Sequence, residues 1–493
     1  MRRDTSCRWV GGPVAMGISF ILCIFLLTLS PDGWTRPGST GPSRGAPRIV
    51  FVEAARVAFG GLSDRFPQGS RLAWFDPASK SPEVKILTEG FFAAADPRPS
   101  FDGTTVLFSG QKGALQAWQV WEMNADGSGP RQVTSCPADC LRPNYLPKDE
   151  IVYSAARNEA GRTEWQLMVS KRDGTDARPI TFGPGDFEVE TVLRNGLIVA
   201  SASWPLQASG PRARTRQLYT IKPDGTELES LRYEHAPAGV KTEAAELDDG
   251  SIVFEGASIA GAAAGGKLAE IGRGALHGAA LGSQAGFSWS ASEFTGDELI
   301  VSRLVPASAG GSGRFDLYSF DVKTAAYRRR IYSDPHFSSI QAVPLAAHET
   351  PKWFWSLVEP KGDAGRLICL DSYLSGDAPK GRIETKIAHV RVLTITLGSN
   401  QEKSLGEAPV ESDGSFYIAV PPDRPVRFEL LDVQGRVIRA QKGWVWARPG
   451  EDRGCAGCHE DRTITPANRW PLALKRFDTP TQMGTANHSE TKP

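Results

Sequence analysis

Two cysteines and a histidine near the C-terminal end of the chain have the spacing of a cofactor-attachment motif. The segment reads Cys455-Ala-Gly-Cys458-His459. Thiols three positions apart can add to both vinyl groups of a haem while the adjacent imidazole binds the iron. A zinc site is one alternative, but it needs two further ligands, for which Cys369 and His488 are available. A disulfide within the motif is another alternative, and it leaves His459 without a role.

Aromatic and basic side chains surround this motif and could form the pocket of a haem. Aromatic rings can cover a porphyrin, and a guanidinium matches the geometry of a propionate carboxylate. Core tryptophans and solvated arginines are the plain alternatives. The predicted pocket residues are Trp444, Trp446, Arg462 and Trp470, with Arg469 as a second arginine.

The iron ligand opposite His459 is predicted only as a pair of candidates. His348 lies beside the aromatic cluster 353–355 at a predicted domain junction, and a second histidine would lower the reduction potential. Met483 would raise the potential, but it lies in a tail rich in Thr, Gly and Asn. An empty position would instead permit chemistry on small molecules.

The other cysteines predict structural roles. Cys136 and Cys140 are close together in a loop, and Leu141 stands where a second haem motif would need a histidine. Outside the cytoplasm, such a pair favours a local disulfide. Cys369 lies in an apolar strand-like segment, which predicts a buried structural thiol, with metal or haem ligation as the alternative.

The first thirty residues predict export. Residues 10–30 carry no charge, and three arginines stand within the first eight positions. A run of that length can span a membrane, with the arginines on the cytoplasmic side. No good small-residue cleavage site follows, so we expect an uncleaved anchor at 1–30, with a cleaved signal as the alternative. After a linker at 31–47, the chain is expected on the periplasmic side of the bacterial inner membrane.

A pattern of about fifty residues repeats between residues 48 and 345. Short β-rich runs carry turns at Asp76, Asp126, Asp173, Asp224 and Asp321, and the first three intervals are 50, 47 and 51 residues. The longer last gap accommodates a degenerate copy near residue 270. Asp-Gly turns tolerate the positive φ that tight hairpins require. This period, with about four strands per unit, is typical of propeller blades and predicts a six-bladed β-propeller at 48–345.

The period disappears in the C-terminal part of the chain. Strand-like runs between 366 and 431 predict a β-sandwich at 346–450, followed by a haem-attachment segment at 451–478 and a disordered tail at 479–493. The predicted fold class is therefore all-β throughout.

Composition excludes one broad class of function. The chain has 493 residues, with 56 Lys and Arg against 56 Asp and Glu. Dedicated nucleic-acid binders carry a clear basic excess, so no nucleic-acid partner is expected.

The repeats resemble the TolB-like propeller family, and the rest of the chain extends the likeness. From about 50 to 470, and most specifically across 411–470, the sequence is similar to the hydrazine synthase alpha subunit family, through the segment EDRGCAGCHEDRTITPANRWPLAL. In that family a propeller precedes a middle domain that carries a c-type haem. The resemblance implies that Cys455 and Cys458 are the thioether cysteines and that His459 is the motif histidine.

Two departures limit what the resemblance implies. The hydrazine synthase subunit continues into a further haem domain, whereas this chain has one CxxCH motif and ends 34 residues after His459. In hydrazine synthase a tyrosine just after the motif binds the catalytic iron, while the motif histidine binds zinc. Here Thr463 follows at the fourth position, and no tyrosine comes after Tyr417. Ordinary ligation by His459 is therefore expected, and hydrazine synthesis is not.

The expected function is that of an exported, membrane-anchored haem protein with a redox role. It would transfer electrons or act as an oxidoreductase on a small nitrogen or oxygen compound. A redox partner protein or a partner subunit would dock on the propeller. The alternative is a TolB-like binding scaffold in which the motif holds a structural zinc ion.

Overall fold

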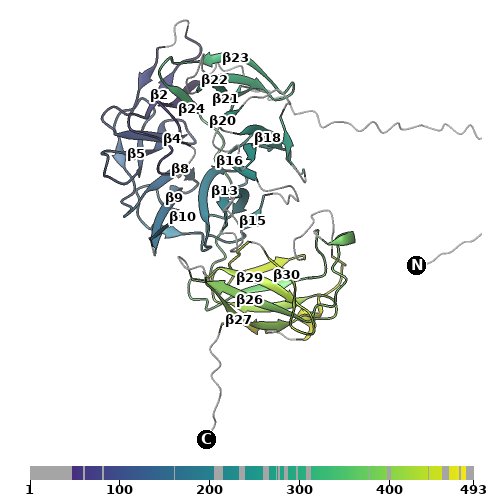
Figure 1. Ribbon diagram of the computed structural model, residues 1–493. Helices are drawn as coiled ribbons and strands as arrows, with labels where there is room; N and C mark the ends of the chain where they lie inside the picture. Colours follow the sequence, from purple (N-terminus) through teal and green to yellow (C-terminus); the bar gives the residue numbers. More distant parts are fainter. Residues whose placement is uncertain are drawn as a thin grey trace, which may run out of the picture. The chain divides into compact units, whose positions relative to one another are not determined.

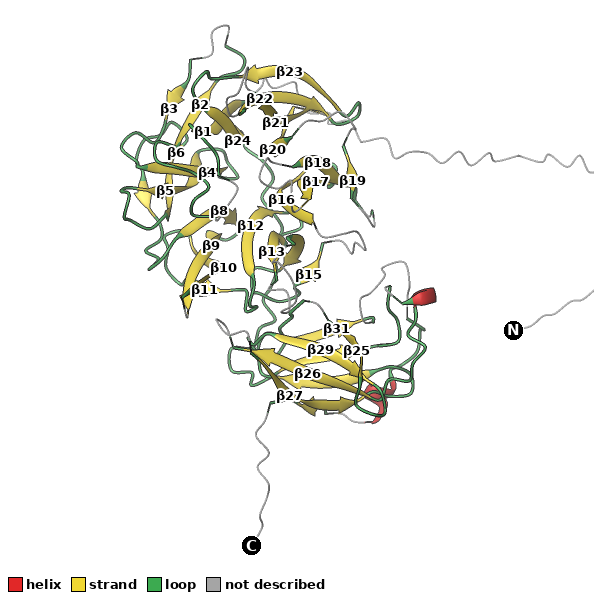
Figure 2. Ribbon diagram, in the orientation of Figure 1, coloured by secondary structure: helices red, strands yellow, loops and turns green. Residues whose placement is uncertain are grey.

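The structure is a computed structural model. It describes residues 47–58, 62–79, 83–159, 161–204, 215–231, 239–258, 266–273, 275, 278–281, 287–295, 298–306, 313–376, 378–396, 401–441, 443–457, 466–476 and 479–484. Within these ranges almost every regular element is a β-strand, and the strands form eight four-stranded sheets. The predicted all-β fold class is confirmed (Figure 2).

Six of these sheets, in the part of the chain that the structure describes, are the blades of a propeller (Figure 1). The first blade contains β1 (Arg48–Ala54), β2 (Arg71–Phe75), β3 (Lys85–Ile86) and β24 (Ser338–Leu345). The second contains β4 (Ala93–Pro99), β5 (Thr105–Gln111), β6 (Gln119–Asn124) and β7 (Arg131–Gln132). The third contains β8 (Cys140–Leu146), β9 (Glu150–Glu159), β10 (Arg162–Lys171) and β11 (Arg178–Pro179).

The other three blades follow the same order of strands. The fourth contains β12 (Asp186–Val192), β13 (Ile198–Ser203), β14 (Gln217–Ile221) and β15 (Glu229–Ser230). The fifth, which includes the degenerate copy, contains β16 (Gly239–Glu246), β17 (Ile252–Ser258), β18 (Lys267–Ile271) and β19 (Ala279–Ala280). The sixth contains β20 (Ser288–Thr295), β21 (Glu298–Val305), β22 (Arg314–Asp321) and β23 (Ala326–Tyr332).

The ring closes by pairing the two ends of the repeat region. Strand β24 pairs antiparallel with β1, with Ile340 opposite Val52, so the last strand completes the first blade. Apolar side chains of neighbouring blades pack against one another; one such core lies between the fifth and sixth blades and includes Val253 and Phe320. Closure covers the apolar face that each blade would otherwise present to water, and the outer edge of each blade is a short strand such as β7.

The two remaining sheets form the C-terminal sandwich. One contains β31 (Asp452–Cys455), β25 (Gly365–Cys369), β28 (Phe416–Val420) and β32 (Thr481–Gln482), in that order. The other contains β27 (Glu402–Pro409), β26 (His389–Ile395), β29 (Val426–Leu431) and β30 (Val437–Ala440). Between them lies an apolar core that includes Leu367, Val392 and Ile418. A 3₁₀ turn (Pro379–Gly381) and a short helix, α1 (Leu472–Arg476), complete the described elements.

The segment between the propeller and the sandwich follows one side of the ring. The backbone N–H of His348 donates to the carbonyl of Phe101 at 2.9 Å, and that of Lys352 donates to Arg194 at 2.8 Å. The Ser356 hydroxyl then donates to Asp224 at 2.9 Å. Contacts with the second and fourth blades therefore hold this connection in place.

The described residues contain no helix that is long and apolar enough to cross a membrane. The predicted anchor at 1–30 and the linker up to residue 46 lie outside the described residues.

Candidate functional site

The first cysteine of the motif ends an edge strand of the sandwich. Strand β31 pairs in parallel with β25, and Cys455 lies directly opposite Cys369. The N–H of Leu370 donates to the Cys455 carbonyl at 2.9 Å. Opposed residues of paired strands point to the same face of a sheet, and Cys369 is buried in the sandwich core. Cys455 therefore lies on the core side of the edge strand, where its side chain is half-buried.

The backbone of the motif is seated tightly against the turn that follows β25. The N–H of Asp371 donates to the Ala456 carbonyl at 3.2 Å. A Cβ added at Gly457 would come within 2.7 Å of the Leu374 carbonyl oxygen. Only glycine fits there without a backbone shift, so the position between the two cysteines is set by this contact. Cys458, His459 and Arg462 lie outside the described residues.

The chain after the motif is held by a buried carboxylate on the turn before β28. Asp413 accepts hydrogen bonds from the backbone N–H of Ser415 and, at 2.9 Å, from that of Leu472 at the start of α1. Arg469 donates to the Asp413 carbonyl at 3.0 Å. Burial opposes ionisation of Asp413, but hydrogen bonds from the Ser415 hydroxyl and from the backbone N–H groups of Leu472 and Ser415 hold its pKa below the ordinary value. This arrangement fixes α1 beside the sandwich.

The three predicted tryptophans have different surroundings. Trp470 is 64% exposed beside α1. Trp444 is buried, with Arg427 near its ring. Trp446 is 1% exposed and belongs to the core between the third and fourth blades, where its Nε1 donates to the Gly225 carbonyl at 2.9 Å. Trp446 therefore contacts the propeller, and its role in a haem pocket remains a prediction.

The two candidate second ligands lie apart from each other. His348 is exposed, and its ring packs edge-on against Phe101 of the second blade at 5.5 Å. Met483 is 2% exposed in the sandwich core, and its backbone N–H donates to Ala419. Iron ligation by Met483 would require its thioether to leave that core.

The structure also revises the start of the predicted disordered tail. Residues 481–482 form β32, which pairs in parallel with β28, because burial of the Met483 side chain holds this segment against the sandwich. Residues 485–493, including His488, lie outside the described residues.

Cys136 and Cys140 form a disulfide in the structure. The bridge lies just before and at the start of β8. The Gln119 side chain donates to the Cys136 carbonyl at 3.0 Å and accepts from its N–H at 2.8 Å. The loop is therefore fixed on both sides of its first cysteine.

The segment leading into the motif is anchored on the fourth blade. Arg453 donates to the Leu228 carbonyl, and Glu451 accepts from the Glu227 N–H at 3.1 Å. Burial raises the pKa of Glu451. Sequence reasoning missed this contact because it joins positions more than 220 residues apart. The Asp-Gly turn at Asp224 was visible, but nothing local indicated that the sandwich binds it.

A second feature missed from the sequence is a ring of polar residues around the propeller axis. Each innermost strand has a bulge at the same place, and one polar side chain lies at each bulge. These residues are Asp96, Arg142, Glu190, Glu243, Ser290 and Gln341. All except Glu190 have a positive φ, between 53° and 55°. The sequence does carry a signal for these residues, because one polar residue recurs within each of the otherwise apolar innermost strands.

Hydrogen bonds connect this ring. Arg142 donates to Glu190 at 2.7 Å and to Glu243 at 2.6 Å. The Gln341 amide donates to Asp96 at 2.8 Å. Neighbouring Glu188 is also buried; although burial opposes ionisation, Arg216 and Arg65 lower its pKa to about 2. The network pairs buried charges with opposite charges, as burial requires.

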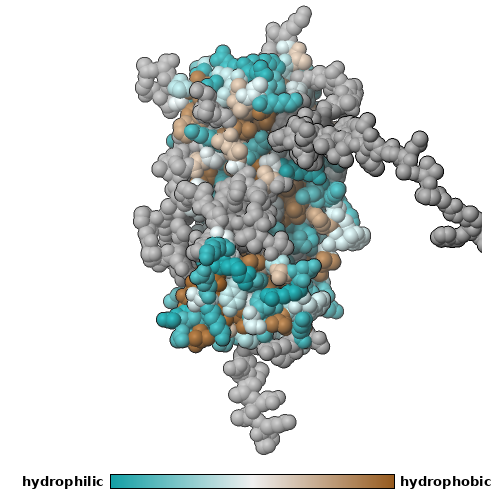
Figure 3. All heavy atoms as spheres, turned by 90° about the vertical axis from the view of Figure 1, so that its right-hand side faces the viewer, coloured by the Kyte–Doolittle hydropathy of each residue, from teal (hydrophilic) through white to brown (hydrophobic). Residues whose placement is uncertain are grey.

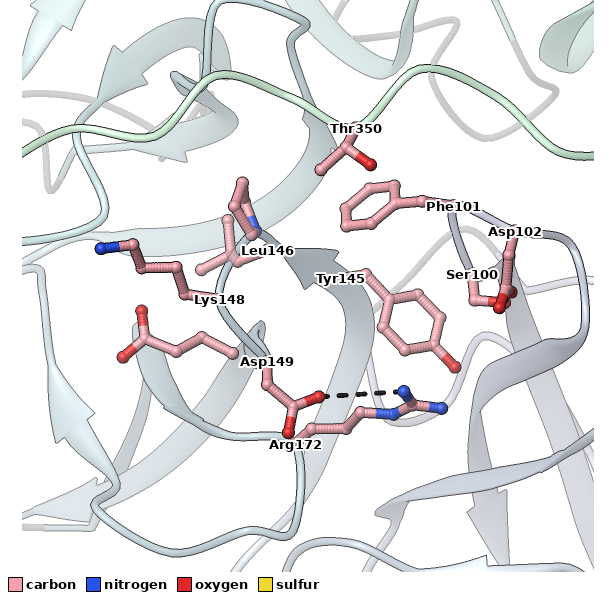
Figure 4. A pocket seen from close by; sticks show the side chains of 11 residues that line it. Ser100, Phe101, Asp102, Tyr145, Leu146, Lys148, Asp149, Arg172 and Thr350 are labelled. Carbon is pink, nitrogen blue, oxygen red and sulfur yellow. Dashed lines mark hydrogen bonds and ion pairs between the residues drawn. The ribbon is translucent and has the colours of Figure 1, made fainter.

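A shallow pocket of about 320 Å³ lies on the propeller between the second and third blades (Figure 4). Phe101 and Tyr145 form one wall, and Lys148, Asp149 and Arg172 lie around the opening. Arg172 and Asp149 are 3.8 Å apart as an ion pair. Because acids and bases alternate here, the pocket favours no single charge of ligand.

One outer face of the molecule mixes hydrophilic and hydrophobic residues. Among the coloured atoms of Figure 3, brown areas are small and separated by teal ones. That view therefore singles out no large apolar surface for a partner among the described residues. The described residues also contain no group of three or more His, Cys, Asp or Glu side chains arranged to hold a metal ion; the motif residues Cys458 and His459 fall outside that set.

Comparison with known proteins gives a consistent relationship. The family described as hydrazine synthase alpha subunit middle domain matches residues 380–460. Hydrazine synthase subunit alpha of Kuenenia stuttgartiensis is 23% identical, covering 84% of this chain and 66% of that protein. The solved Kuenenia stuttgartiensis hydrazine synthase matches with a TM-score of 0.74 and 22% identity, over 88% of this chain and 71% of that chain. TolB from Acinetobacter baumannii matches with a TM-score of 0.44 and 13% identity, over 62% of this chain and 67% of that chain.

Proposed function

We propose, on the premise that the chain is a hydrazine synthase alpha-like protein, that it is an exported c-type haem protein with a redox role. One observation carries the proposal. The pentapeptide at 455–459 falls within the stretch that matches the hydrazine synthase alpha middle domain, and its first cysteine ends an edge strand of the sandwich.

The residues around the motif fit a covalently attached haem. Cys455 and Cys458 would form the thioethers, and His459 would bind the iron on one side. Cys455 is partly exposed at the end of the edge strand. The exposed ring of Trp470 supports a role in covering the porphyrin. When bound, a c-type haem supplies reversible one-electron transfer at its iron.

The protein's own part is to hold the attachment segment still. Trp446 and Arg453 fasten the segment before the motif to the fourth blade. Asp413 fastens the segment after it to the sandwich. A ligand held by locked neighbours keeps its geometry during reaction. Arg462 remains the proposed partner of a haem propionate.

The proposal extends to compartment and partners. Covalent haem attachment in bacteria takes place outside the cytoplasm, so we propose that residues 10–30 direct export and anchor the chain in the inner membrane. The curated relative is a subunit by name, and by analogy we propose a partner subunit or redox protein that docks on the propeller. Hydrazine synthesis is not proposed, because a tyrosine just after the motif binds the catalytic iron in that family and no tyrosine stands between His459 and Pro493.

A pyridine haemochrome spectrum tests the proposal. Full-length protein exported together with the cytochrome c maturation system should show one thioether-linked haem per chain. The double variant Cys455→Ala/Cys458→Ala should show none. The double variant Cys136→Ala/Cys140→Ala, which removes a disulfide on the propeller, is the matched control and should keep its haem. A colourless wild-type protein that contains zinc would overturn the proposal in favour of a binding scaffold with a structural metal.

A further inference from the structure

A third cysteine lies beside the attachment motif. Cys369 and Cys455 are direct partners in the parallel ladder between β25 and β31. Neighbouring strands are about 4.8 Å apart, and the Cα atoms of disulfide-linked cysteines are typically 4.4–6.8 Å apart. Both side chains lie on the core side of the sheet. The fold therefore brings two cysteines that are 86 residues apart in the sequence to opposed positions, and the structure shows both as thiols.

Backbone contacts on both sides of the pair maintain this register. The Leu370 N–H donates to the Cys455 carbonyl at 2.9 Å, and the Asp371 N–H donates to the Ala456 carbonyl at 3.2 Å. On the preceding side, Arg366 lies opposite Asp452 and the two side chains form an ion pair. The two cysteines cannot separate unless the edge strand detaches, so each has a high effective concentration for the other.

We infer that Cys369 and Cys455 form a disulfide in the folded chain before haem is attached, and that this bond controls access to the first attachment thiol. Disulfides form in the compartments to which exported proteins go, and the same chain carries the Cys136–Cys140 bridge. The control of haem attachment rests on the proposed function, whereas the disulfide itself does not.

The chemistry needs a disulfide donor and later a reductant. Cys455, which is half-buried, attacks the disulfide of an exported dithiol oxidase, and one donor thiol leaves. The Cys369 thiolate then attacks the Cys455 sulfur of the mixed disulfide, and the second donor thiol leaves. Two electrons and two protons pass from the cysteine pair to the donor. A dithiol reductant reverses the exchange and restores the Cys455 thiol, which haem attachment requires.

Peptide mapping of haem-free protein tests the bond. The full chain would be exported from a host without cytochrome c maturation, quenched in acid, treated with N-ethylmaleimide and digested with trypsin without reduction. Cleavage should yield peptides 367–380 and 454–462. We expect more than half of the molecules to show these two peptides cross-linked through Cys369 and Cys455, with Cys458 alkylated. If Cys369 is alkylated throughout and Cys455 is bonded to Cys458 or alkylated, the inference is overturned.

Haem loading provides a second, separable readout. Without added reductant, Cys369→Ala should take up haem at least threefold more than wild type, and with a dithiol reductant the two should be equal. Cys369→Val, which keeps an apolar side chain in the core, guards against a folding defect. Equal loading without reductant would contradict the control over attachment. If no variant binds haem under any condition, the proposed function fails, while the cross-link result still decides the disulfide.

Discussion

The surroundings of reactive side chains differ between the axis of the propeller, where they are buried and paired, and the edge of the sandwich, where they are partly exposed. At the axis, Arg142 is 2% exposed and binds two carboxylates. At the sandwich edge, Cys455 is half-buried at the end of a strand with one neighbour in its sheet. Charges that are already paired inside a protein are poor partners for a ligand. This difference supports the sandwich edge as the site of the proposed haem chemistry and a structural role for the propeller axis.

The strain at the axis supports that assignment. Five non-glycine residues at the inner bulges have a positive φ, and each such conformation costs about 1 kcal/mol or more. It persists because side chains at these bulges bond to groups on neighbouring blades. The ring therefore stabilises the closed propeller as a unit, and the sandwich uses that unit as its support.

The largest expected effect comes from breaking the axis. In Arg142→Leu, Glu190 and Glu243 lose the guanidinium between them, and two buried carboxylates remain. Loss of one partner from a buried ion pair costs about 3–5 kcal/mol, so the urea midpoint should fall steeply. The exposed pair Arg328–Asp321 provides the control: Arg328→Ala should leave the midpoint unchanged. Equal midpoints for wild type and Arg142→Leu would show that the ring does not support the propeller.

The second effect tests how the propeller supports the sandwich. Trp446→Ala removes a fully buried ring from the core between the third and fourth blades and should destabilise the protein by about 3 kcal/mol. It should also expose the segment before the motif to limited proteolysis. The control is Trp470→Ala, whose ring is 64% exposed; it should keep wild-type stability and change only the haem spectrum. If Trp446→Ala raises the protease sensitivity of the propeller but not of residues 446–457, the anchoring role is wrong.

Contacts between distant positions, such as those of Arg142 and Trp446, mark the limit of sequence-based prediction for this chain. Asp-Gly turns and alternating apolar residues are local, so the propeller, its six repeats and the sandwich were predictable. The CxxCH motif was also visible because its residues are adjacent in the sequence. The pairing of Trp446 with Gly225, of Cys369 with Cys455 and of Arg142 with Glu243 joins distant positions, and no local pattern encodes it. The position of Met483 is not encoded locally either: its tail is polar, and only the fold reveals the core position that its side chain fills.

A third prediction concerns Glu255, a buried carboxyl group between the fifth and sixth blades. None of the groups that shift its pKa is a cation. Burial raises the pKa of Glu255 to about 8. A hydrogen bond from Ser288 opposes this rise, and the nearby charge of Glu243 adds to it. Since the unfolded value is 4.5, the stability that its protonated form contributes is present below pH 4.5 and is lost as the pH rises to about 8.

Glu255→Gln should remove this pH dependence. Measured by urea unfolding, the variant should gain about 3 kcal/mol on wild type between pH 5 and pH 8, an order-of-magnitude value from the size of the shift. Parallel pH profiles for wild type and Glu255→Gln would mean that Glu255 is ionised in the folded protein.

The smallest expected effect on stability is at the motif itself. There we expect a substitution to lower the haem yield more than the free energy of unfolding. In Gly457→Ala the new Cβ would come within 2.7 Å of the Leu374 carbonyl oxygen, so the backbone between the two attachment cysteines must move, at a cost of about 1 kcal/mol. Haem yield per folded molecule should fall at least tenfold, because this shift moves the two sulfurs away from the spacing at which both can reach the vinyl groups. Gly454→Ala is the matched control, since its Cβ would meet only Ile368 at an ordinary 3.9 Å, and it should load haem normally. A Gly457→Ala protein with full haem content would show that the contact with Leu374 does not position the motif.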